Sequence, residues 1–276
     1  MKRSWMLALA LALAATPARA HFLFLLPPGP GDKAPVVRLV FSDSPAPDDP
    51  KLLDKVKHTE LFEIGPARKA DPAATKLLAD ARAARANWEN FPGFSADVEV
   101  NFDGKVTTGT VTADPKGKVV VQLSDPEASA WARRMLGSIV GHRLPDGGEE
   151  KTPCAFGDDV TDHPLGRAIH VLNDEFHSSY RVRDRQIIVV NRKMADARFT
   201  ITVLANQLNE EKKFLPASYV VDTWDLKTGA LRSSEANHQT WVRVGKYDLP
   251  AGVLSVTAAP ERHEARSLKL TGHRLH

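Results

Sequence analysis

The stretch FPGFSADVEVNFDGKVTTGTVTADPKGKVVVQL, residues 91–123, decides the fold of this chain. Between residues 94 and 102 apolar and polar side chains alternate, which is the period of a strand with one buried face. Asp103 and Gly104 suit the left-handed positions of a tight hairpin turn. Residues 114–117 (DPKG) predict a second turn before a third strand at 119–123. The stretch therefore predicts an antiparallel meander, and it contains no motif for a reaction.

The flanking sequence predicts two helices and more of the same sheet. Asp71 and Asp125 are each followed by proline, a typical helix start, and apolar residues then recur at helical spacing, reaching Trp88 after the first start. Residues 145–166, rich in glycine and proline, predict a long loop. Further strands are expected at 167–173, 176–183, 186–192, 198–206, 218–225, 231–244, 252–259 and 267–272. We therefore expect an α+β fold, in which a large curved antiparallel sheet of about ten strands forms an incomplete barrel with two amphipathic helices on one face.

The first twenty residues have the pattern of a secretory signal peptide. Lys2 and Arg3 precede an apolar run at 5–15 that is too short to span a bilayer, and residues 18–20 (ARA) match a signal-peptidase site. We therefore expect an exported protein, periplasmic or extracellular, whose mature chain begins at His21.

The charge balance excludes one class of partner. The whole chain has 37 basic and 34 acidic residues, and loss of Lys2, Arg3 and Arg19 with the signal peptide would leave 34 of each. A neutral mature chain without a long basic run argues against nucleic acid. After residue 20 no apolar stretch approaches the ~20 residues of a membrane helix, so we expect no transmembrane segment.

The mature chain is expected to have two parts. Residues 21–64 contain three short extended runs and predict a short N-terminal β segment. About forty residues make a poor independent core. Residues 71–276 carry both helix starts and all the later strands, and they predict one antiparallel domain that resembles a half-barrel.

Several segments of the larger part resemble a known family. FPGFSADVEV, GTVTADPKGKV, HSSYRVRDRQIIVVNR and TWDLKTGALRSSEANHQTWVRVGKYDLPAGV are similar to a bacterial family of exported domains of unknown function, over residues of about 71–275. The helix, strand and hairpin at its start more distantly resemble periplasmic lipoprotein carriers. That resemblance implies an incomplete barrel around helices, with an apolar cavity for acyl chains. The N-terminal segment, HFLFLLPP onward, weakly resembles an exported family linked to metal handling.

Large side chains on the predicted helices and strands are candidates for a ligand site between sheet and helices. A non-enzymatic binding protein for a lipid or another apolar or amphipathic molecule is the function that we rank first. The candidate ligand-binding residues are Trp88, Trp131, Met135, Trp224 and Trp241. The alternative is that these side chains form ordinary core. Arg181, Arg183 and Arg185 alternate and predict a solvated strand face that runs into a turn.

Copper binding is the first alternative function. A mature N-terminal His21 would offer its α-amine and an imidazole nitrogen, a pair that can chelate Cu(II). At least one more donor is needed, and the sequence does not say which other histidine supplies it. Chance is the competing explanation, because signal peptidase leaves some residue first in every exported protein.

A periplasmic hydrolase is the second alternative. The chain has no G-x-S-x-G elbow, H-E-x-x-H motif, P-loop or dinucleotide fingerprint. His177, Ser178 and Ser179 are adjacent, but adjacency in sequence is not triad geometry. The sequence therefore favours a binding protein over an enzyme and names no catalytic residue.

Overall fold

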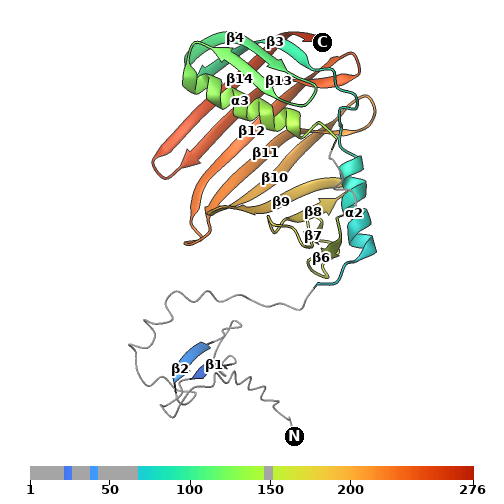
Figure 1. Cartoon of the computed structure of the whole chain (residues 1–276), viewed down its shortest axis with the longest axis vertical. Helices are drawn as coiled ribbons and strands as arrows, with labels where there is room; N and C mark the ends of the chain where they lie inside the picture. The colour runs from blue at the N-terminus through green and yellow to red at the C-terminus, as the bar shows by residue number, and fades with distance from the viewer. Residues whose placement is uncertain (1–21, 27–37, 43–67, 146–151) are drawn as a thin grey trace. The chain divides into compact units, whose positions relative to one another are not determined.

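The computed structural model describes residues 22–26, 38–42, 68–145 and 152–276 (Figure 1). The chain divides into two compact units, Met1–Pro66 and Ala67–His276. In the first unit, strands β1 (Phe22–Leu26) and β2 (Arg38–Ser42) pair antiparallel. Residues 1–20 and His21 lie outside the described residues, so the signal peptide and its cleavage site stay predictions.

The second unit is built on one antiparallel sheet of twelve strands and two helices. The strand order is β5-β4-β3-β14-β13-β12-β11-β10-β9-β8-β7-β6, which leaves β5 and β6 as the two edges of a curved, unclosed sheet (Figure 1). The strands are β3 (Phe94–Phe102), β4 (Lys105–Ala113), β5 (Val119–Leu123), β6 (Cys154–Phe156), β7 (Arg167–Val171), β8 (Ser179–Arg183), β9 (Gln186–Met194), β10 (Ala197–Leu208), β11 (Phe214–Asp225), β12 (Leu231–Val244), β13 (Tyr247–Ala259) and β14 (Arg262–Leu275). The expected α+β half-barrel is confirmed.

The alternation in residues 94–102 produces β3 as expected. Its buried side chains include Phe94, Val98 and Val100, whereas Asp97 and Glu99 between them are exposed. At the β3–β4 turn, Asp103 and Gly104 have φ values of 46° and 97°, the left-handed conformation of a tight hairpin. On its other side β3 pairs with β14, the last strand of the chain. This pairing places the last strand of the chain beside the first long strand of the domain, inside the sheet.

Both helices begin where the Asp-Pro pairs predict. Asp71 caps α2 (Pro72–Ala83) by accepting from Ala73 N at 2.7 Å, and Asp125 caps α3 (Pro126–Gly141) by accepting from Glu127 N at 2.9 Å. In Figure 1, α3 crosses the part of the sheet that contains β3, β4, β13 and β14, and α2 runs beside β6 to β9. Each helix therefore covers a different end of the sheet.

The helices and the sheet bury two separate hydrophobic clusters. The larger cluster joins α3 to β3, β4, β5, β13 and β14, and includes Phe94, Val98, Trp131, Leu136 and Leu249. The smaller joins α2 to β6, β7 and β8, and includes Leu78, Cys154, Ile169 and Tyr180. The middle strands β9 to β11 contribute little to either cluster, and most of their residues are only half-buried.

Two local expectations are wrong. The predicted loop 145–166 contains β6, which pairs antiparallel with β7. Contacts with α2 also hold this short strand: Asp71 N donates to Cys154 O at 2.7 Å, and Cys154 N donates to Thr75 Oγ1 at 3.1 Å. The first helix ends at Ala83 and does not reach Trp88. The residue that follows the helix bonds to β11 instead, because Phe214 N donates to Ala84 O at 2.9 Å. At both places the chain is also held by contacts with residues that are remote in sequence.

Candidate functional site

A cavity of about 860 Å³ lies between α3, the end of α2 and strands β8 to β14. Small-molecule sites in proteins range over roughly 300–1,000 Å³. The cavity is therefore large enough for a ligand, and it lies over the strands that the two hydrophobic clusters leave half-covered.

One face of α3 forms the cavity wall. Its lining residues, separated by three or four positions, include Trp131, Met135, Ser138 and His142, the residue that caps the helix. The adjacent face packs into the core through Ala128, Ala132, Leu136 and Val140. The α3 helix therefore holds its cavity-facing side chains in place by burying its other face.

The opposite wall is an apolar part of the sheet. Ile201 on β10 lies opposite Val190 on β9 and Val221 on β11, and all three line the cavity. Val203 and Tyr219 form the next pair along the same two central strands and also face it. These five side chains give the cavity a continuous, half-exposed hydrophobic wall.

A polar spot interrupts this wall at Tyr219. The hydroxyl of Tyr219 accepts a hydrogen bond from Gln239 Nε2 at 2.9 Å. Burial, with a contribution from the Glu235 carboxylate, raises the pKa of Tyr219 to about 12. The phenol is therefore neutral at physiological pH, and it can donate a hydrogen bond but does not act as a phenolate nucleophile.

Among the described residues that line the cavity, arginine is the most frequent type. The arginines are Arg82, Arg85, Arg134, Arg143, Arg185, Arg192, Arg262 and Arg266, and the lining carboxylates are Glu127 and Glu235. His142 lies among these arginines. Desolvation by the surrounding protein lowers the pKa of the His142 imidazole, and the positive charges of Arg143, Arg85 and Arg192 lower this pKa further. The cavity therefore combines an apolar wall with a strongly cationic one.

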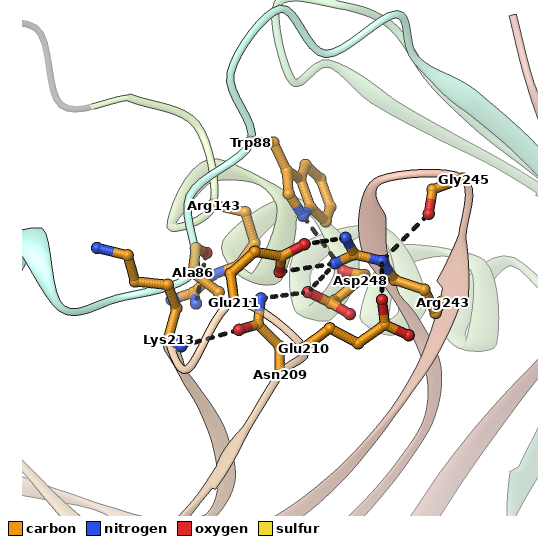
Figure 2. Close-up of polar contacts among 10 residues, drawn as sticks. All are labelled: Ala86, Trp88, Arg143, Asn209, Glu210, Glu211, Lys213, Arg243, Gly245 and Asp248. Carbon is orange, nitrogen blue, oxygen red and sulfur yellow. Dashed lines mark hydrogen bonds and ion pairs between the residues drawn. The ribbon is translucent and has the colours of Figure 1, made fainter.

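A polar network fixes the sheet beside the cavity, and we call it the end cluster (Figure 2). Arg243 on β12 pairs with Glu211 in the β10–β11 hairpin and with Asp248 Oδ2 at 3.0 Å. Asn209 Nδ2 also donates to Asp248 Oδ2 at 2.8 Å. Hydrogen bonding to Arg243 holds the pKa of the Glu211 carboxyl below its usual range. The end cluster ties two hairpin tips together.

The segment after α2 is attached to the same end of the sheet. Arg143 Nη1 donates to Ala86 O at 3.1 Å, and Trp88 N donates to Arg143 O at 2.6 Å (Figure 2). The Arg143 guanidinium also lies 5.8 Å from the ring of Trp241. Through Arg143, residues 86–88 and the end of α3 are positioned relative to the cavity wall.

Comparison with known families identifies the larger unit. The model of the family described as "Protein of unknown function (DUF3386)" matches residues 69–272. The chain belongs to this family. The resemblance over residues of about 71–275 that the sequence indicated is therefore confirmed, and it carries no assigned activity. Comparison with curated proteins gives no match for this DUF3386 protein.

Three solved structures are similar to the DUF3386 protein at low sequence identity. A LolA superfamily protein from Nitrosomonas europaea is 12% identical, with 74% of this chain and 93% of that chain covered, at a TM-score of 0.35. A domain assigned as an outer membrane lipoprotein-sorting protein from Vibrio parahaemolyticus is 9% identical. The match covers 73% of this chain and 91% of that chain, at a TM-score of 0.34. A DUF1329 family protein from Desulfovibrio piger is 8% identical. The match covers 74% of this chain and 92% of that chain, at a TM-score of 0.25. Similarities of this size place no ligand on the chain, so its function is argued from its own residues.

The structure brings three of the five candidate ligand-binding residues to the cavity. Trp131, Met135 and Trp241 line it. Trp88 lies in the larger hydrophobic cluster with 2% of its surface exposed. Trp224 lies on β11 with the Arg198 guanidinium 5.1 Å from its ring centre. The cavity lining therefore contains fewer of the candidate residues than the sequence predicts: Trp88 and Trp224 do not belong to it.

The sequence interpretation missed the arginines of the cavity. Arg181, in the alternating set, fits the expected strand face only in part, because it is half-buried and pairs with Asp158 at 3.1 Å. Arg185, in the turn that follows, lines the cavity. The other lining arginines lie on α2, α3, β9 and β14, or next to these elements, and no motif in the sequence connects them.

The alternatives gain no support within the described part of the chain. The copper hypothesis depends on His21, which lies outside it. Among the described residues no group of three His, Cys, Asp or Glu side chains is placed to hold a metal ion. As a separate finding, no helix in the described residues is long and apolar enough to cross a membrane. His177 and Ser178 lie in the turn between β7 and β8, where Ser178 N donates to Asp174 Oδ2.

Proposed function

We propose that this protein is an exported, non-enzymatic binding protein that holds an apolar or amphipathic molecule between the sheet and its helices. One observation carries the proposal: the 860 Å³ cavity has the Val190–Ile201–Val221 row on one side and Trp131 and Met135 on the other. The three sheet residues of this row are only half-buried, and apolar surface that faces a cavity is costly in water unless something covers it. A hydrocarbon chain is the simplest occupant with the matching chemistry.

The energies are sufficient for useful affinity. Burying an alkyl chain stabilises a complex by ~0.8 kcal/mol per methylene, or roughly 12 kcal/mol for about fifteen. An association cost of ~4 kcal/mol or more leaves at most about 8 kcal/mol, which corresponds to a micromolar dissociation constant at best. A carrier or sensor needs reversible binding, and micromolar affinity is compatible with both roles.

The test is binding of a fluorescent fatty-acyl probe to the gently purified protein, together with organic extraction of any lipid that co-purifies. Val203→Trp places an indole in the cavity and is expected to reduce probe affinity at least tenfold. Leu204→Trp is the matched control, because Leu204 is the next residue on β10 and is 66% exposed outside the cavity lining. Absence of both probe binding and co-purified lipid would refute the proposal.

Export is a separate part of the proposal and rests on residues 1–20. If the A-x-A site is used, the exported protein begins at His21. Mass spectrometry of the periplasmic or secreted fraction measures this directly. An intact Met1 in that fraction would contradict the cleavage and would also remove the copper hypothesis.

A further inference from the structure

The charge of the cavity wall differs from the charge of the chain. Over the whole sequence 37 basic residues are nearly balanced by 34 acidic ones. Among the described residues of the cavity lining there are eight arginines, two glutamates and no lysine. One of the two, Glu127, lies 3.7 Å from Arg266, and the other, Glu235, accepts from Asn237 Nδ2 at 3.0 Å. Cationic character is therefore concentrated in this cavity.

Four of the arginines lie around the end of α3. Arg85, Arg143 and Arg192 are close enough to His142 to lower the pKa of its imidazole, and all of them line the cavity. Tyr180 connects two members of the group, because Arg192 Nη2 donates to its hydroxyl at 3.1 Å and the Arg82 guanidinium lies 5.8 Å from its ring centre. We call Arg82, Arg85, Arg143 and Arg192 the arginine group.

The apolar part of the cavity begins directly beside the arginine group. Ile139 and Met135 precede His142 by three and seven residues on the same cavity-lining face of α3. At a rise of 1.5 Å per residue, this face runs about 10 Å from His142 to Met135 and continues to Trp131. A molecule with one charged end and one hydrocarbon chain can therefore contact both regions at once.

We propose that the ligand is a single-chain amphiphile with an anionic head group, a carboxylate or a phosphate monoester, placed at the arginine group with its chain along Ile139, Met135 and Trp131. This inference rests on the proposed function of the cavity and adds the charge of the ligand. Guanidinium groups match both oxyanions in geometry and form hydrogen bonds about twice as strong as neutral ones. The head group adds to the contacts that these arginines already make.

The first experiment compares head groups on the unmodified mature protein. A fluorescent long-chain fatty acid, its methyl ester and the corresponding alkyl phosphate are titrated at pH 8 and low ionic strength, below micelle formation. At least one of the two anionic probes, the acid or the phosphate, should bind about tenfold more tightly than the neutral ester. Equal affinity for all three overturns the inference but leaves the proposed function intact. Failure of all three to bind removes both.

The second experiment places the head group. Arg85→Gln combined with Arg192→Gln should weaken binding of the anionic probe about tenfold and leave methyl ester binding unchanged. Retained ester binding shows that the cavity is still folded. Arg133→Gln is the matched control, since Arg133 is exposed on α3 and lies outside the cavity lining. If the double variant binds the anionic probe as tightly as the unmodified protein does, the placement of the head group is overturned. The first experiment compares acid with ester on the unmodified protein, so its result does not depend on whether any variant folds.

Discussion

The indole Nε1 of Trp88 donates a hydrogen bond to the main-chain oxygen of Asp248 at 3.2 Å, across 160 residues of sequence. The ring is 2% exposed and lies 4.5 Å, centre to centre, from Phe91. Asp248 is at the same time the partner of Arg243 and Asn209 in the end cluster (Figure 2). Trp88 therefore connects the segment after α2 to the β12–β13 hairpin, and it lies outside the cavity lining.

Trp88→Ala should destabilise the fold strongly. Loss of a buried tryptophan leaves a cavity and costs about 3–5 kcal/mol. Trp88→Phe keeps a ring but removes the donor to Asp248, and should cost ~1–3 kcal/mol. Urea unfolding followed by circular dichroism measures both. A cost of Trp88→Ala below about 1 kcal/mol would show that the residue is not part of the core.

Trp131 should behave differently, because it lines the cavity and packs edge-on against Phe102 with ring centres 5.4 Å apart. Trp131→Leu keeps an apolar side chain in the core, and we expect ~1–2 kcal/mol of lost stability. It should also weaken acyl probe binding several-fold and reduce the change in tryptophan emission on titration. Trp88→Phe is the control, and it should leave probe affinity unchanged. Equal probe affinity in both variants would contradict the placement of the ligand along α3.

The sequence predicted those features that depend on neighbouring residues. The alternation at 94–102, the turn at Asp103-Gly104 and the two Asp-Pro helix starts are set by local geometry, and all appear in the structure. Strand β6 and the end of α2 were missed, and both are held by residues remote in sequence, Thr75 and Phe214. Each lies outside any local window.

The candidate site was only partly predictable for the same reason. Trp131 and Met135 follow from the helical pattern of α3, because one helix face carries both. Arg82, Arg192 and Arg266 come from α2, β9 and β14, and they share a cavity only because the sheet curves. No local spacing can indicate such a group. A single sequence therefore indicated a cavity and its apolar wall but not the charge within it.

Substitutions at two charged residues of the end cluster, Arg243 and Glu211, should have unequal effects on stability. Arg243 is 22% exposed and contacts Asp248, whose side chain is 11% exposed, whereas the Glu211 side chain is 50% exposed. Arg243→Met leaves Asp248 without its cation in a mostly dry position and should cost about 2–3 kcal/mol. Glu211→Gln removes a pairing that solvent screens, and its effect should be much smaller. Chemical denaturation at low and high salt measures both, and equal losses would contradict this assignment.

A dependence of stability on pH follows from two histidines. Burial lowers the pKa of His170, with Arg68 adding to the effect, and the pKa of His142 is lowered in its cavity by burial and arginines. In both cases the folded protein binds fewer protons than the unfolded chain below the ordinary histidine pKa of about 6.5. The contribution to stability is therefore complete above that pH and is lost as the pH falls from it toward the lowered folded values.

The measurement is urea unfolding at pH 7.5, 6.0 and 5.0 for the mature protein and for the double variant His142→Gln/His170→Gln. The unmodified protein should lose stability across this range, and the double variant should lose less, because glutamine takes up no proton. Carboxylates with lowered pKa values, such as Asp174, titrate below this window and do not interfere. His163→Gln serves as the control for general effects of removing a histidine. Parallel pH profiles for the unmodified protein and the double variant would show that neither imidazole is kept neutral by the fold.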